Sequence, residues 1–163
     1  MRQKLIVVMA LAVALAQPAA ARAQKLVYVV RHAERADEPA RNQQDPTLSA
    51  AGRARAARLE AILADAGVHG IYVTKYRRTQ ETARPLADKL KITPELMPDS
   101  VSALVADLKA RHARDVVLLV AHSTTIPGII KGLGGPGVTL DESDYNSLFV
   151  VLPSTGVASR LRF

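Results

Sequence analysis

The run Leu26-Val27-Tyr28-Val29-Val30, followed at once by Arg31-His32-Ala33, decides the fold of this chain. Five apolar residues, three of them β-branched, predict a strand that is buried on both faces, as in a parallel sheet. Ligands bind at the carboxyl edge of open α/β sheets, so Arg31 and His32 are candidate site residues. An imidazole there can act as a nucleophile, and a guanidinium can hold a phosphoryl group with two bonds. On this tripeptide alone, a strand that simply surfaces beside a solvated arginine and a structural histidine is the alternative.

Strand and helix patterns alternate along the rest of the chain. A second unbroken apolar run, 116–120, also ends close to a histidine, His122. This alternation predicts a single α/β domain over residues 24–163, built as a three-layer α/β/α sandwich around a mostly parallel sheet. The expected strands are 26–30, 71–73, 116–120, 148–152 and 157–163, and the expected helices are 50–66, 79–90, 101–112 and 125–133.

The first 23 residues have the layout of an export signal. Arg2 and Lys4 precede an apolar run of 12 residues, 5–16, and Ala21-Arg22-Ala23 fits the small-x-small cleavage pattern. We therefore expect cleavage after Ala23 and a periplasmic or secreted protein. Because 12 apolar residues are too few to cross a bilayer comfortably, we expect no stable membrane span after cleavage. An uncleaved N-terminal anchor is the alternative.

Charge and composition exclude several classes of partner. The whole chain has 22 Lys+Arg against 15 Asp+Glu, but three of the basic residues lie in 1–23, which leaves a net charge of +4 for 24–163. That charge, with 4% aromatic residues, suits a small phosphorylated substrate and predicts no nucleic-acid binding. We also expect no cofactor and no metal. The four histidines lack metal-ligand spacing, and the glycine-rich stretch 132–137 follows a predicted helix rather than a strand.

Residues that carry chemistry follow three of the predicted strand ends. Arg31-His32 follows the first, Tyr76-Arg77-Arg78-Thr79 comes after the second, and His122-Ser123-Thr124 follows 116–120. The carboxyl ends of parallel strands lie on one edge of a sheet, so two histidines and two or three arginines should converge there. One imidazole would attack phosphorus in line, while the arginines and the second imidazole neutralise the equatorial oxygens.

Five stretches of the sequence resemble the histidine phosphatase superfamily, which has the phosphoglycerate mutase-like fold. They are 29–34, 48–52, 74–83, 118–123 and 145–150, in the order the family has them. The resemblance implies that His32 is the nucleophile that becomes phosphohistidine. It also implies that Arg31, Arg78 and His122 complete the phosphate pocket as catalytic and substrate-binding residues. Arg78 stands at the family's arginine position, so Arg77 is expected on the substrate side or in solvent.

The chain departs from the family at the general acid, the carboxylate that protonates the leaving group. Some members carry an Asp directly after the second histidine, where this chain has Ser123, and others a Glu before the central strand. The candidates here are Glu95 and Asp99, and Asp99 is the one we retain. Its alternative role is to cap the helix 101–112, which Ser100 could also do.

The sequence therefore predicts an exported phosphomonoester hydrolase that works through a phosphohistidine on His32. One alternative is a phosphatase for phosphohistidine or other phosphorylated groups on proteins or cell-envelope molecules. Another is a non-catalytic relative that binds phosphate without turning it over. A mutase is less expected, because the short chain lacks the insertions that build a specificity lid in larger members. The sequence does not indicate whether the protein is a monomer or an oligomer.

Overall fold

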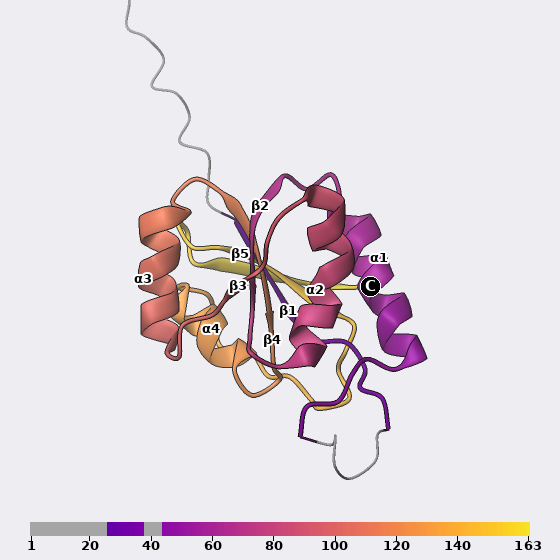
Figure 1. Cartoon of the computed structure of the whole chain (residues 1–163). Helices are drawn as coiled ribbons and strands as arrows, with labels where there is room; N and C mark the ends of the chain where they lie inside the picture. Colours follow the sequence, from indigo (N-terminus) through magenta and orange to yellow (C-terminus); the bar gives the residue numbers. More distant parts are fainter. Residues whose placement is uncertain (1–25, 38–43) are drawn as a thin grey trace, which may run out of the picture.

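The computed structural model describes residues 26–37 and 44–163 (Figure 1). The expected signal segment 1–23 lies outside the described residues, and so does 38–43. Within the described ranges, no helix is long and apolar enough to cross a membrane.

A six-stranded sheet with the strand order β3-β2-β4-β1-β5-β6 forms the centre of the molecule. The first four strands of that order run parallel, and β5 and β6 are each antiparallel to the strand before them. The expectation of a mostly parallel sheet is confirmed. The strands are β1 (Leu26–Arg31), β2 (Val68–Val73), β3 (Glu95–Leu96), β4 (Val116–Ala121), β5 (Ser147–Leu152) and β6 (Val157–Arg162).

Two pairs of helices cover the two faces of this sheet, so the three-layer expectation is confirmed as well (Figure 1). One apolar core joins α3 and α4 to one face of the sheet, and a second core joins α1 and α2 to the other. Alternate residues of β4 serve the two cores, which is why the run 116–120 has no polar position. The helices are α1 (Ala50–Leu63), α2 (Arg77–Leu90), α3 (Val101–Arg111) and α4 (Ile126–Gly132).

The start of α2 differs from the sequence expectation, whereas α3 begins at Val101 as expected. Helix α2 begins at Arg77 and not at Thr79, because the Thr79 hydroxyl donates back to the Tyr76 carbonyl at 2.8 Å and ties the first turn to the preceding loop. Helix α3 is capped by Ser100, whose hydroxyl accepts from the Ala103 amide at 3.1 Å. Asp99 is therefore not the cap, and its carboxylate has no structural role in starting α3.

The register of the sheet positions the residues that follow β1, β2 and β4. Arg31 pairs with Ala121 across the parallel strands, and the His32 amide donates to the Ala121 carbonyl at 2.9 Å. Val73, the last residue of β2, pairs with Val120 on the other side of β4. The residues that directly follow β1, β4 and β2 at the carboxyl edge are therefore neighbours. They are His32, His122 and Thr74, respectively.

The loop after His32 is held by a close approach of α1. The Ser49 amide donates to the Glu34 carbonyl at 2.9 Å, and the Ser49 hydroxyl caps α1 by accepting from the Gly52 amide. A Cβ on Gly52 would overlap the Glu34 carbonyl oxygen, so only glycine fits at this crossing. This contact explains why the stretch 48–52, which contains Ser49 and Gly52, bears on the site: it holds the loop that follows His32.

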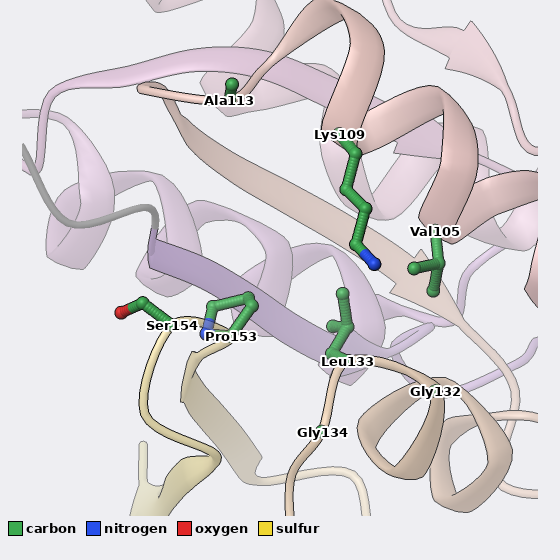
Figure 2. A pocket seen from close by; sticks show the side chains of 8 residues that line it. All are labelled: Val105, Lys109, Ala113, Gly132, Leu133, Gly134, Pro153 and Ser154. Carbon is green, nitrogen blue, oxygen red and sulfur yellow. The ribbon is translucent and has the colours of Figure 1, made fainter.

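A cavity of about 380 Å³ lies at the opposite edge of the sheet, between α3, the end of α4 and the turn after β5 (Figure 2). Ala113 precedes β4 and Pro153 follows the antiparallel β5, so both mark the edge where the parallel strands begin. Figure 2 shows the Lys109 side chain reaching into this space beside Val105. The cavity is separate from the edge that carries His32 and His122.

Candidate active site

His32 is almost fully buried, with 4% of its surface exposed, and its ring is held in one orientation. Its Nδ1 lies 2.8 Å from the Ala33 carbonyl oxygen. A carbonyl can only accept, so Nδ1 carries the hydrogen and the neutral ring keeps its lone pair on Nε2. In this tautomer, Nε2 is the ring nitrogen that is available to act as a nucleophile.

The His122 ring lies beside His32, with 5.3 Å between ring centroids. Its Nε2 is 3.0 Å from the Thr74 hydroxyl, which is 2.9 Å from the Thr79 hydroxyl. The Thr79 hydrogen is used on the Tyr76 carbonyl, so Thr74 donates to Thr79 and must accept from His122. The two threonines therefore fix the His122 tautomer with hydrogen on Nε2 and leave Nδ1 as the atom that gains a proton.

Both imidazoles are neutral in the free protein. Burial lowers the pKa of His32 to about 3, and the charges of Arg31, His122 and Arg78 act in the same direction against the Ala33 hydrogen bond. Burial and the charges of Arg78 and Arg31 lower the pKa of His122 to about 4. A bound dianion would offset the arginine charges, so the same site favours proton uptake by the imidazoles only when an anion is present.

Arg31 is aimed by the loop before β5. Its guanidinium donates to the backbone carbonyls of Asp141 and Glu142 and stacks over the Tyr145 ring, 4.0 Å from the centroid. Tyr145 also lies edge-on to His32, with 6.0 Å between ring centroids. The Nε of Arg31 is buried and has no acceptor among the described residues. One guanidinium N–H is thus left for an incoming anion.

Arg78 is the least satisfied cation of the site. Its guanidinium stacks on Tyr76 at 4.2 Å and has one loose ion pair, 3.8 Å to Asp45. Its Nε is also buried without an acceptor among the described residues. Burial, and after it the charge of Arg35, lowers the pKa of Arg78. A buried guanidinium with so few partners costs free energy unless an anion binds it.

The structure thus brings Arg31, His32 and His122 to one edge, and Arg78 joins them through ring contacts. Tyr76 links the last two, because its ring lies edge-on to His122 at 5.3 Å while it stacks on Arg78. Arg77 points elsewhere: its side chain is 53% exposed and pairs with Glu81. The exposed side chain of Arg77 agrees with the expectation that this residue lies on the substrate side or in solvent.

The two candidate acids are in different places. Glu95 pairs with Arg111 at 2.7 Å, on β3. Asp99 lines a cavity of about 410 Å³ together with His122, Thr74 and Tyr76. The structure therefore associates Asp99, and not Glu95, with the second histidine. No cluster of three or more metal-ligating side chains occurs among residues 26–37 and 44–163.

Sequence reasoning missed the supporting residues Thr74, Tyr76, Thr79 and Tyr145. The sequence signal was present for the threonines, since hydroxyl side chains at the end of β2 and in the first turn of α2 commonly bind nearby backbone. The tyrosines lie in the stretches 74–83 and 145–150 that resemble the family, but the sequence alone gave neither of them a role. Their rings matter because each lies against a guanidinium, which only the folded loops bring together.

We expect Thr74→Val to lower kcat/KM for phosphate hydrolysis about tenfold, because His122 loses the acceptor that fixes its tautomer. Thr74→Ser keeps the hydroxyl and should retain most of the rate. Steady-state kinetics together with the ¹⁵N shifts of the His122 ring measure the effect. Wild-type kinetics in Thr74→Val, with an unchanged tautomer, would contradict this role.

The lowered histidine pKa values predict a loss of stability at acid pH. Between about pH 6.5 and 4, the unfolded chain binds protons that folded His32, with a pKa of about 3, does not bind. The free energy of unfolding should therefore fall as the pH is lowered through this window and should not change from this cause above pH 7. In urea titrations, His32→Ala should reduce that slope by about 1 kcal/mol per pH unit. Equal slopes for the two proteins would show that His32 titrates normally when folded.

Comparison with known proteins agrees with this geometry. Residues 27–100 match the sequence model of the histidine phosphatase superfamily, branch 1. None of the curated proteins searched matches the chain. Among solved structures, the protein histidine phosphatase SixA bound to tungstate is 19% identical, with a TM-score of 0.66 over 83% of this chain and 94% of that one.

Two further structures have the same fold. The SixA protein of Agrobacterium tumefaciens is 20% identical, with a TM-score of 0.62 over 85% of this chain and 96% of that one. A mycobacterial glucosyl-3-phosphoglycerate phosphatase is 16% identical, with a TM-score of 0.55 over 77% of this chain and 88% of that one. The sequence match covers His32 and Arg78, and the likeness of fold extends over the strands and helices beyond it. Residues 27–100 are therefore similar in sequence to the histidine phosphatase superfamily, and the solved structures show that the chain has the fold of these phosphatases.

Proposed function

We propose that this protein is a phosphomonoester hydrolase that forms a phosphohistidine on His32. The observation that carries the proposal is the pair of buried guanidinium Nε groups, on Arg31 and Arg78, that have no acceptor among the described residues. They accompany two neutral imidazoles whose rings are 5.3 Å apart. A neutral nucleophile and guanidinium N–H groups that still lack an acceptor suit a dianionic phosphoryl group.

The first chemical step is the transfer of the phosphoryl group to His32. Nε2 forms a bond to phosphorus while the bond to the leaving oxygen breaks. Arg31, Arg78 and the second histidine, His122, hold the equatorial oxygens as charge spreads over them. Water then attacks the phosphohistidine, inorganic phosphate leaves, and neutral His32 is regenerated for the next turnover.

The leaving oxygen needs a proton, and we assign Asp99 as its donor. Asp99 shares a cavity with His122 and is not used to cap α3. We expect Asp99→Asn to slow hydrolysis of an alkyl phosphate about 30-fold more than that of 4-nitrophenyl phosphate, whose leaving group needs no proton. Matched kcat/KM measurements on the two substrates give this ratio. Equal losses on both would remove Asp99 from the reaction.

We also propose that the protein acts in the periplasm or outside the cell. The support is the sequence layout of residues 1–23, with Arg2 and Lys4 before an apolar run and the Ala21-Arg22-Ala23 pattern after it. The N-terminal sequence of protein recovered from a periplasmic fraction tests this. A start at Gln24 is expected, and full-length protein in the cytoplasmic fraction contradicts export.

The test of the proposed activity is hydrolysis of 4-nitrophenyl phosphate with a chelator present, followed by labelling with a ³²P-labelled substrate that is quenched in alkaline detergent. We expect turnover and an acid-labile, base-stable label on His32, as a phosphoramidate bond requires. A protein that binds phosphate tightly but shows neither turnover nor label is the non-catalytic binder, and this outcome overturns the proposal.

A second candidate function is hydrolysis of phosphohistidine in proteins. The specific support is the fold likeness to SixA, a protein histidine phosphatase that aligns over 94% of its own length. The two candidates share His32 chemistry and differ in the leaving group. Comparing kcat/KM for a phosphohistidine protein with that for small phosphomonoesters separates them.

A further inference from the structure

We infer that the cavity beside His122 receives the leaving group, and that this leaving group is compact, uncharged and largely apolar, such as an aryl ring. The inference rests on the proposed function. The cavity measures about 410 Å³, within the range of roughly 300–1,000 Å³ that small ligands occupy in proteins.

The cavity is continuous with the candidate active site. Three of its lining residues, Thr74, Tyr76 and His122, belong to the hydrogen-bond and ring contacts described above. In an in-line transfer, the leaving group departs on the side of phosphorus opposite His32. A phosphoryl group held between the two histidines and Arg78 therefore has this space next to it for the group that it carries.

The lining of the cavity favours apolar atoms. The Tyr76 ring lines it, and so do five aliphatic or thioether side chains: Leu96, Met97, Val101, Leu104 and Ile129. Leu96 is 63% exposed, the highest value among the exposed large hydrophobic side chains of the described residues. It does not belong to either core, so a bound ring would give this side chain a partner that the fold does not supply.

The charges of the cavity argue against a second phosphate or carboxylate on the substrate. Lys75 is the single cationic lining residue, and it is balanced by Asp99. Lys75 also lies 5.7 Å from the centre of the Tyr76 ring. Recognition of a polyanion would need several guanidinium or ammonium groups here, as the phosphate pocket itself has. A neutral leaving group has no such requirement.

The test compares 1-naphthyl phosphate as substrate with inorganic phosphate as competitive inhibitor. Phosphate fills the phosphate pocket and does not reach the cavity. In Leu96→Ala we expect KM for 1-naphthyl phosphate to rise about fivefold while Ki for phosphate changes less than twofold. Leu161→Ala is the matched control, because Leu161 is a 52% exposed leucine on the edge strand β6. It should change neither constant.

The wild-type protein provides a second measurement. Its kcat/KM should be at least tenfold higher for 1-naphthyl phosphate than for 4-carboxyphenyl phosphate, which has a similar aryl leaving group but carries a carboxylate. An unchanged KM in Leu96→Ala, a parallel rise in Ki, or equal rates on the two substrates each overturn the inference while leaving the proposed function intact. Absence of hydrolysis of every phosphomonoester by the wild type overturns the proposed function instead.

Discussion

His32→Ala should lose at least about 10⁴-fold in kcat for phosphomonoester hydrolysis and should form no phosphoenzyme. The ring is held by the 2.8 Å contact of Nδ1 with the Ala33 carbonyl, so that Nε2 keeps the lone pair. The nearby Thr74 hydroxyl cannot replace it readily, because this hydroxyl already accepts from His122 and donates to Thr79. Steady-state kinetics and ³²P labelling with an alkaline quench measure the two losses.

His69→Ala is the control for this variant. His69 is exposed on β2, near the start of the strand and far from its carboxyl end, so its removal should leave turnover unchanged. His32→Ala should still bind inorganic phosphate, since Arg31, Arg78 and His122 remain. A residual phosphoenzyme in His32→Ala would assign the covalent step to another residue, and full activity would refute the mechanism.

The sequence was sufficient to predict the layers of the fold and the convergence of the site. The unbroken apolar runs 26–30 and 116–120 predict strands buried on both faces, and the histidines that follow them must then meet at one sheet edge. The observed pairing of Arg31 with Ala121 is the direct cause of that meeting. An unbroken apolar run is a local pattern, so the sequence alone is enough to identify a strand that is buried on both faces.

The missed parts of the site depend on contacts between distant segments. Tyr145 is 114 positions from the Arg31 that it supports, and no local pattern joins them. The start of α2 was placed at Thr79 because a threonine before a helical pattern resembles a cap. The Thr79 hydroxyl instead accepts the hydrogen bond from Thr74, which in turn accepts from His122. These hydrogen bonds form only when β2 and β4 are adjacent.

Arg78→Met should lower kcat/KM about 10³-fold and yet leave the free protein as stable as the wild type, or more stable by about 1 kcal/mol. The wild-type guanidinium is held by a stacked Tyr76 ring and a loose 3.8 Å pair with Asp45, with a buried Nε that has no acceptor among the described residues. Methionine fills similar space without a charge to desolvate. Urea unfolding in the absence of phosphate measures the change in stability, and steady-state kinetics on one aryl phosphate measure the change in kcat/KM.

Arg55→Met is the control for this prediction, because it removes a partly buried arginine that has a close anionic partner within the fold. Arg55 is also a partly buried arginine, but it pairs with Glu34 at 2.6 Å and donates to the Phe163 carbonyl. Removing it leaves the Glu34 carboxylate without its partner, so stability should fall by about 2 kcal/mol. If Arg78→Met destabilised the protein as much as Arg55→Met does, Arg78 would be a structural residue. The opposite signs are expected because Arg55 has a close anionic partner within the fold, whereas Arg78 has only the loose pair with Asp45 until a substrate binds.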